Sequence, residues 1–183
     1  MMRELSLNIL DIAQNSISAQ AKNITILVRA SGGELTITIE DDGKGMSEEF
    51  LSKVMDPFTT TRTTRKVGMG LPLFKEAAES SGGSMKITSE LGVGTVVTAS
   101  FQIDHIDRMP LGDLAGTMTI LIMAKPEIDF VLEYAVEDRS YKFDTKEIKS
   151  ILDGVPIESS EIITYLEGLI NDNITQVNGG AVI

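Results

Sequence analysis

The first hundred residues switch repeatedly between the apolar period of a helix and that of a strand. Residues 3–20 carry an apolar stripe at three- and four-residue spacing, which predicts an amphipathic helix. Residues 23–29 and 34–41 alternate apolar with polar side chains, which predicts two strands that each bury one face. Ser-Gly-Gly at residues 31–33 predicts a hairpin turn between them. The chain therefore opens with a helix followed by a β-hairpin.

Helices and strands continue to alternate up to the end of the first hundred residues. Ser47 and the two glutamates after it predict the start of a short helix that ends near Val54. A further helix is predicted over residues 70–80, since proline is tolerated in a first turn. Two more strands are predicted over residues 84–89 and 95–102. This mixture of helices with hairpin-connected strands indicates an α+β fold.

The pattern breaks around residues 103–110, and we place a domain boundary after residue 105. Helices are predicted beyond it over residues 111–125, 145–152 and 159–177, and hairpin strands over 128–136 and 140–144. The sequence therefore predicts one domain at residues 1–105 and a small α/β C-terminal extension at residues 106–183. We expect this extension to dock on the first domain or on another protein, and its last six residues to fray.

Composition and charge restrict the classes of function. The chain has no cysteine, which excludes disulfides, thiolate metal sites and cysteine nucleophiles. No apolar run approaches the roughly 20 residues that span a bilayer, and the N-terminus lacks the pattern of a signal peptide. Residues 104–183 hold 15 of the 27 acidic residues but only 6 of the 16 basic ones. Because no basic face is visible, we expect a cytoplasmic protein that binds neither membrane nor nucleic acid.

Asp41 is the first candidate for chemistry. It ends the apolar row of its strand, where burying an unpartnered carboxylate is costly. Such a carboxylate can accept a hydrogen bond from an amino group, for example that of adenine. Gly43 and Gly45 after it allow a tight turn and a close approach of the backbone to a flat ligand. The alternative is an ordinary Asp-Asp-Gly turn that leaves the strand. Asp42 points to the opposite face of the strand from Asp41, and we expect its side chain to be solvated.

Three further groups of residues accompany Asp41. Asp11 and Asn15 lie one turn apart on the first predicted helix, so they project from the same face. A polar, cationic stretch without periodicity covers residues 58–66 and leads into the glycine pair of residues 68–70. A second glycine pair precedes Thr95 between two predicted strands. Each group alone is a weak signal, whereas their order along the chain is a strong one.

This order resembles the GHKL superfamily of ATP-binding domains, which is named for gyrase, a heat-shock chaperone, histidine kinases and MutL. The resemblance covers residues 5–102 and includes every motif in the expected order. It implies a two-layer α/β sandwich, the Bergerat or histidine-kinase-like ATPase fold, with a mixed, mainly antiparallel sheet and helices on one face. It also implies that ATP binds between the helix layer and a lid.

The resemblance implies ATP and Mg²⁺ as cofactors and assigns roles to individual residues. The implied ATP-binding residues are Asn15, Ala19, Asp41, Gly43, Gly45, Met46, Phe58, Thr59, Thr60, Arg62, Arg65, Lys66, Gly68, Met69, Gly70, Leu71 and Thr95. Asn15 would coordinate magnesium through its amide oxygen, which suits this hard ion. Asp41 would recognise adenine together with Thr95, and the residues from Gly43 to Met46 would wall the base.

The implied lid begins at Phe58. It supplies three cationic side chains, those of Arg62, Arg65 and Lys66, within reach of a polyphosphate. The alternative for this stretch is a solvated surface loop. Residues 68–71 resemble the segment that is called the second glycine box in this superfamily, where a helix N-terminus can bind phosphate oxygens. Pro72 departs from the family pattern, which often has glycine there. We expect ATP binding to survive this change, with a stiffer lid hinge.

Asp11 decides how much catalysis the resemblance implies. At its position the ATP-hydrolysing and anti-sigma members carry glutamate as a general base, and most histidine kinases carry asparagine. Asp11 has the charge of that glutamate but is one methylene shorter. It is therefore a candidate catalytic residue that activates a water or a substrate hydroxyl. A second magnesium contact and a helix-surface carboxylate are the alternatives.

We therefore expect a small cytoplasmic regulatory switch that binds Mg-ATP, hydrolyses it slowly and contacts a protein partner through residues 106–183. One alternative is a protein kinase of the anti-sigma or split-histidine-kinase type, which transfers the γ-phosphoryl group to a separate protein. Self-phosphorylation of the usual kind is not expected, because few residues precede the first helix and His105 lies in a junction. A second alternative is a non-catalytic nucleotide-binding module. The oligomeric state stays open.

Overall fold

One open six-stranded sheet organises the molecule. The structure is a computed structural model that describes residues 3–55 and 69–183. Its strands are β1 (Asn23–Ser31), β2 (Glu34–Asp41), β3 (Met85–Glu90), β4 (Gly94–Gln102), β5 (Asp129–Val136) and β6 (Arg139–Asp144). They lie in the order β3-β4-β2-β1-β5-β6, and every neighbouring pair is antiparallel except β1 with β5.

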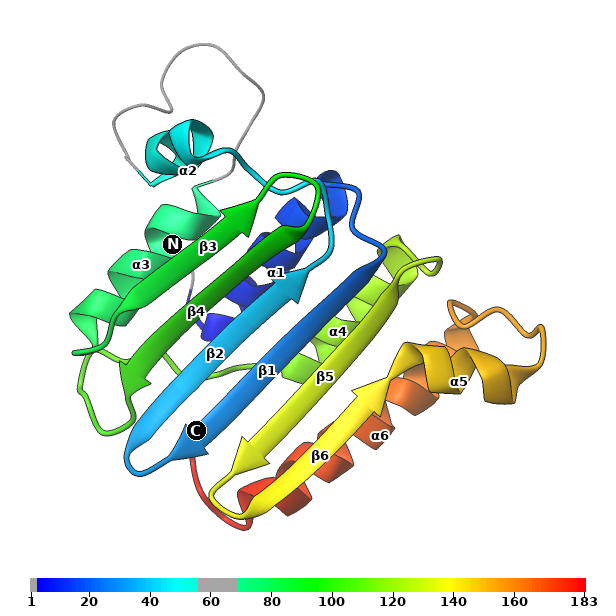
Figure 1. The fold of residues 1–183 in the computed structure, drawn as a ribbon. Helices are drawn as coiled ribbons and strands as arrows, with labels where there is room; N and C mark the ends of the chain where they lie inside the picture. The colour runs from blue at the N-terminus through cyan, green and yellow to red at the C-terminus, as the bar shows by residue number, and fades with distance from the viewer. Residues whose placement is uncertain (1–2, 56–68) are drawn as a thin grey trace.

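Helices cover one face of this sheet. The described residues form the helices α1 (Leu5–Ser18), α2 (Glu48–Val54), α3 (Gly70–Ser80), α4 (Leu114–Ala124), α5 (Thr145–Leu152) and α6 (Ser160–Asn178). Figure 1 shows α3, α1, α4 and α6 side by side behind the strands, while the other face of the sheet is open. The expected two-layer α/β sandwich with a mixed, mainly antiparallel sheet is confirmed.

The core lies between the two layers, where the alternating sequence pattern predicts it. Ile24, Ile26 and Val28 of β1 are buried, whereas the residues between them are only partly covered. From the helix side, Leu5 and Ile9 of α1 are fully buried against the sheet. These alternating apolar rows fix which face of each strand turns towards the helices, because a slip of one residue would expose the whole row.

The C-terminal residues continue the sheet of the N-terminal ones. β5 pairs with β1 over eight residues, from Asn23 opposite Asp129 to Ala30 opposite Val136. α4 lies next to α1, and the Thr117 hydroxyl donates a hydrogen bond to the carbonyl oxygen of Ser6 (3.4 Å). A functional division after residue 105 stays a prediction, although no break in the sheet coincides with it.

A backbone hydrogen bond holds the last residue of the chain. The amide of Leu111 donates to the carbonyl oxygen of Ile183 (3.3 Å), so the C-terminal residue lies against the start of the predicted extension.

Within the described ranges, 3–55 and 69–183, no helix has both the length and the apolar character needed to cross a bilayer.

Candidate functional site

A small cavity of about 50 Å³ lies where α1 ends beside β2 and β4. It is lined by Ile12, Asn15, Ser16, Ala19, Ile39, Asp41, Leu71, Thr95 and Val97. The structure therefore brings together five of the predicted site residues, which come from α1, β2, α3 and β4. The cavity is mainly apolar, but Asp41 gives it a carboxylate, Asn15 an amide, and Ser16 and Thr95 two hydroxyl groups.

Asp41 is held in place by its neighbours and keeps the capacity to bind a ligand. Its Oδ2 accepts a hydrogen bond from the buried hydroxyl of Ser16 (2.5 Å), and its Oδ1 accepts one from the amide of Gly43 (2.9 Å). A carboxylate can accept about four hydrogen bonds, so two positions remain. Sequence reasoning missed the role of Ser16. Its signal is a hydroxyl within the apolar stripe of α1, next to Asn15.

Asp42 has a different role from that of Asp41. It accepts hydrogen bonds from the amides of Lys22 and Asn23 (2.7 and 2.8 Å) and from the Asn23 side chain (2.8 Å). Partial burial raises the pKa of its carboxyl, but these hydrogen bonds outweigh that effect and hold the pKa below its ordinary value. Asp42 is exposed, as the sequence predicts, and its hydrogen bonds tie the end of β2 to the start of β1.

The two glycines after Asp41 are required by neighbouring backbone. A Cβ on Gly43 would lie 2.8 Å from the carbonyl oxygen of Ala19, and one on Gly45 would overlap the carbonyl oxygen of Glu90. Gly45 also has a φ of +67°, which favours glycine. Neither glycine, nor Met46, is among the residues that line the cavity. The close approaches instead pack the turn against α1 and the β3–β4 hairpin.

Ser89 links this turn to the far side of the cavity. Its hydroxyl accepts from the amide of Met46 (2.8 Å), lies 2.8 Å from the Thr95 hydroxyl and donates to the carbonyl oxygen of Gly94 (3.0 Å). Thr95 in turn lies directly opposite Asp41 in the sheet. Ser89 is a second residue that sequence reasoning missed. Only the pairing of β3 with β4, which places it opposite Thr95, reveals it.

Asp11 lies beside the start of α3. A Cβ on Gly70 would overlap the Asp11 carboxylate, so the absence of a side chain at residue 70 allows this approach. Leu71 is buried and lines the cavity, whereas the preceding Met69 is 69% exposed. The remaining predicted site residues, Phe58, Thr59, Thr60, Arg62, Arg65, Lys66 and Gly68, lie outside the described residues.

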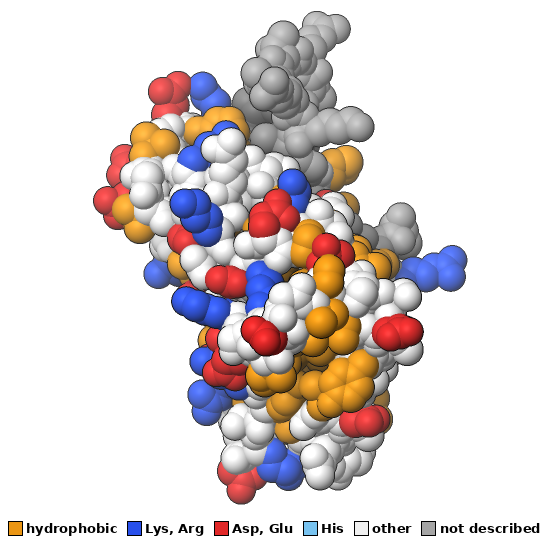
Figure 2. All heavy atoms as spheres, turned by 90° about the vertical axis from the view of Figure 1, so that its right-hand side faces the viewer, with side chains coloured by type: hydrophobic (Ala, Val, Ile, Leu, Met, Phe, Trp, Pro, Cys, Tyr) orange, Lys and Arg blue, Asp and Glu red, His pale blue; other side chains and the backbone are white. Residues whose placement is uncertain are grey.

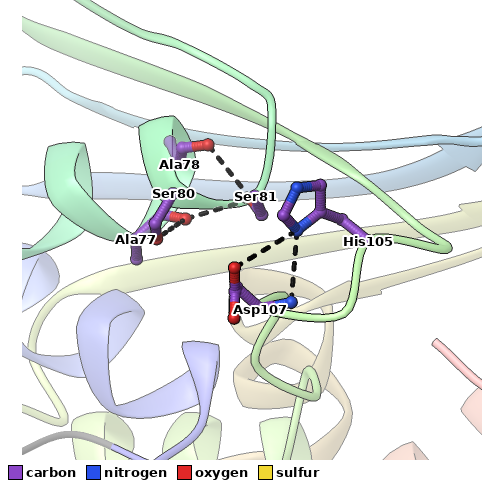
Figure 3. Close-up of polar contacts among 6 residues, drawn as sticks. All are labelled: Ala77, Ala78, Ser80, Ser81, His105 and Asp107. Atoms are coloured by element: carbon purple, nitrogen blue, oxygen red, sulfur yellow. Dashed lines mark hydrogen bonds and ion pairs between the residues drawn. The ribbon is translucent and has the colours of Figure 1, made fainter.

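His105 lies far from these groups. It follows β4, whose strand rise of ~3.4 Å per residue places it roughly 25 Å from Thr95 along the sheet. Figure 3 shows it near Ser81, at the end of α3, with its Nδ1 accepting from the amide of Asp107 (3.1 Å). The Asp107 carboxylate lies 3.9 Å from the same nitrogen. The ring thus belongs to a turn at the opposite end of the sheet from Asp41.

The curated proteins that the chain resembles include a sporulation kinase and a sensor histidine kinase. The chain is 33% identical over 89 residues to sporulation kinase C of Bacillus subtilis, which is 48% of this chain and 21% of that protein. It is 31% identical over 94 residues to the sensor histidine kinase CitA of Klebsiella pneumoniae, covering 50% of this chain and 17% of that protein. The chain therefore spans about a fifth of the length of these relatives.

Comparison with solved structures supports the fold. The Aquifex aeolicus MutL ATPase domain complexed with ADP superposes with a TM-score of 0.53 at 16% identity, over 78% of this chain and 64% of that one. The N-terminal domain of a DNA repair protein gives a TM-score of 0.54 at 17% identity, over 85% and 59%. A protein-family model matches residues 1–105, which is more than half of the chain. The chain belongs to the family of histidine kinase-, DNA gyrase B- and HSP90-like ATPases.

Proposed function

We propose that this protein binds Mg-ATP in the cavity beneath α1 and hydrolyses it slowly as a cytoplasmic regulatory switch. The observation that carries the proposal is Asp41, whose carboxylate is oriented by Ser16 and Gly43 and retains free acceptor positions. It lies in an apolar cavity together with Asn15 and Thr95. An apolar slot with one oriented carboxylate suits a flat base that carries an amino group.

Asn15 is the residue that we propose for Mg²⁺. Its side chain lines the cavity, and no hydrogen bond within the described residues occupies its amide oxygen. Magnesium usually takes one or two protein oxygens and completes its shell with phosphate and water. The described residues contain no group of three histidine, aspartate or glutamate side chains that could hold a metal ion by themselves.

Asp11 is the proposed general base. Hydrolysis joins a water oxygen to the γ-phosphorus, breaks the bond to the β-phosphate oxygen and releases ADP and phosphate, while the base takes the proton of the water. Asp11 lies one turn before Asn15 and beside the first residue of α3. This position sets its carboxylate next to a helix N-terminus, a preferred place for phosphate oxygens.

Calorimetry and a phosphate-release assay test this proposal. We expect ATP to bind in a magnesium-dependent manner and to be hydrolysed slowly. Asp11→Asn should keep the affinity within about threefold but lower turnover at least a hundredfold, because positioned bases contribute 10²–10⁴-fold. Unchanged turnover in Asp11→Asn would remove Asp11 from the mechanism. Absence of ATP binding to the intact protein would refute the whole proposal.

Phosphoryl transfer to a separate protein is the second candidate. It is favoured by the curated relatives, which are named as kinases. With γ-labelled ATP and cell extract, we expect the intact protein, but not Asn15→Ala, to label an acceptor protein. Label that accumulates only as free phosphate would favour hydrolysis over transfer.

Residues 106–183 are the proposed site of a protein partner. Figure 2 shows apolar side chains gathered on the side of the molecule where β6, α5 and α6 lie, with carboxylates at the margin. Ile151 of α5 and Tyr165 of α6 are 76% and 65% exposed. Residues 150–183 contain five acidic and no basic side chains. An apolar patch with an acidic margin suits a partner with apolar anchors and basic flanks.

Substitutions in this patch test the partner proposal. The double variant Ile151→Ser/Tyr165→Ser should fold normally, because both side chains are exposed, and should lose a partner that the intact protein retains in the presence of ATP. Ile106→Ser is the matched control, since Ile106 is 94% exposed elsewhere on the surface. Equal retention by all three proteins would exclude this patch as the interface.

A further inference from the structure

Asn8 of α1 is a buried polar residue that the proposed mechanism leaves unexplained. Its side chain is 1% exposed, and neither its Oδ1 nor its Nδ2 has a hydrogen-bond partner within the described residues. Leaving a buried polar group without a hydrogen-bond partner lowers the stability of the folded state. Native structures contain few such groups, and each one calls for a reason.

The position of Asn8 on α1 supplies a reason. Asn8 precedes Asp11 by three residues and Asn15 by seven, so the three side chains project from one flank of the helix. α1 lies between α3 and α4 (Figure 1), and the contact of Asp11 with Gly70 shows that this flank faces α3. Asn8 is therefore buried between α1 and α3, one helical turn below the proposed catalytic base.

The Asp11 carboxylate is within reach of the Asn8 amide. Residues three apart on a helix have their Cβ atoms ~5–6 Å apart, and amide–carboxylate pairs at this spacing form hydrogen bonds. Helical side chains also lean towards the N-terminus, which carries the Asp11 carboxylate over the turn that contains Asn8. In the present structure Asp11 lies against the start of α3 instead, and no Asn8–Asp11 hydrogen bond is formed.

We infer that Asn8 is a positioning residue for Asp11, whose carboxylate accepts a hydrogen bond from the Asn8 amide once nucleotide occupies the site. The inference rests on the proposed ATPase function. In the free protein the Asn8 amide has no hydrogen-bond partner, which lowers stability. It gains an acceptor when the Asp11 carboxylate leaves the start of α3. The Asn8 side chain thereby fixes the direction in which Asp11 takes a proton.

Ser6 provides a matched control on the same helix. Its hydroxyl is also fully buried and without a partner in the described part of the chain. Residues two positions apart on a helix lie about 160° apart around its axis, so Ser6 lies on the flank opposite to Asn8. The carbonyl oxygen of Ser6 accepts a hydrogen bond from Thr117, so this part of α1 packs against α4, which lies on the other side of α1 from α3 (Figure 1).

Stability and turnover of Asn8→Leu and Ser6→Ala test the inference. Both variants should unfold at the same or a higher urea concentration, because each removes an unsatisfied group. Asn8→Leu should lower kcat about tenfold with KM unchanged, whereas Ser6→Ala should change neither. In the background of Asp11→Asn, Asn8→Leu should cause no further loss. A loss of stability in Asn8→Leu, unchanged kcat or additive losses would each overturn the inference. Asn8→Ala replaces Asn8→Leu if the larger side chain prevents folding.

The Asn8 amide can also be observed directly by NMR, independently of turnover. Its side-chain signals, assigned by their loss in Asn8→Leu, should move downfield when ADP and Mg²⁺ are added, and should stay in place in Asp11→Ala. A signal that does not move in the intact protein, or that moves equally in Asp11→Ala, overturns the inference. Calorimetry with the same ADP separates this result from a failure of the proposed function, because in that case no nucleotide binds at all.

Discussion

The two halves of the sheet use their polar side chains in opposite ways. On the β5–β6 side the polar groups satisfy one another: Lys149 binds the carbonyl oxygen of Ile128 and the carboxylate of Asp129 (both 2.9 Å), and Tyr134 donates to Asn178 (2.5 Å). On the β2–β4 side, Asp41 and Asn15 keep acceptor positions free in an apolar cavity.

The contrast between the two halves indicates which polar groups of this molecule can bind a ligand. A polar group whose partners are all within the protein contributes to stability, whereas an oriented group with capacity left can bind a ligand. Asp41 and Asp42, which are adjacent in sequence, fall on the two sides of this distinction. The same comparison defines variants that separate binding from stability.

The largest effect is expected at Asp41. Asp41→Ala should weaken ATP binding at least a hundredfold, about 3 kcal/mol, because it removes the proposed partner of the adenine amino group. Asp42→Ala should leave the affinity within about threefold and instead lower the free energy of unfolding by about 1 kcal/mol through the lost hydrogen bonds. Calorimetry and urea titration measure the two quantities. Equal losses of affinity in both variants would show that Asp41 and Asp42 do not differ in their contribution to ATP binding.

A somewhat smaller effect is expected at Gly45. Gly45→Ala forces a Cβ onto the backbone of Glu90 at a positive φ and should lower the free energy of unfolding by about 2–3 kcal/mol. Gly32→Ala is the control, since Gly32 has a φ of +60° but open space around it, and it should cost about 1 kcal/mol. Chemical denaturation measures both. Similar losses of stability at the two glycines would show that the positive φ, and not the close approach to Glu90, determines the loss.

A third prediction concerns Tyr134, on the satisfied side of the sheet. Tyr134→Phe removes one buried hydrogen bond and should lower stability by about 1 kcal/mol at pH 7, with ATP binding unchanged. Burial raises the pKa of Tyr134 to about 12, so the stability that it contributes should be complete below pH 10 and be lost between pH 10 and 12. Urea midpoints across this range should fall less steeply in Tyr134→Phe. Parallel curves for the two proteins would contradict this linkage.

The smallest effect is the acid response of Asp42. Because the pKa of its carboxyl is lower in the folded protein, its contribution to stability is present above the unfolded value of about 4 and is lost as the pH falls through the folded value. Asp42→Asn should therefore be slightly less stable at pH 7 and equal to the intact protein at the lowest pH. Thermal unfolding from pH 7 to pH 3 checks this, and a constant difference would speak against it.

The order of helices and strands could be predicted from local patterns, and five of the residues that line the cavity could be predicted from the motifs. Alternation in residues 23–41 and the glycines that follow are local signals, and so is the spacing of Asp11 and Asn15. The partners of these elements could not be predicted. Ser89 acts through its place opposite Thr95, and Asp42 through the amides of Lys22 and Asn23, which only the pairing of strands brings near.

The C-terminal residues show the same limit on a larger scale. Their helices and hairpin were predicted, with α4 beginning at Leu114 and β5 at Asp129. Their position at the open edge of β1 was not, because an apolar row indicates that a strand has a buried face but does not identify its neighbour. Long-range pairing depends on which edges remain free after the local elements have formed.

The parallel pairing of β1 with β5 has a consequence for how the protein is made. Asn23 and Asp129 are about a hundred residues apart in the chain, so β1 leaves the ribosome long before its neighbour. At synthesis rates of about 5–20 residues per second, one edge of β1 is open for roughly 5–20 seconds. An open strand edge can pair with strands of other chains. Conditions that slow translation between these two segments should therefore favour aggregation of the nascent chain without changing the stability of the finished protein.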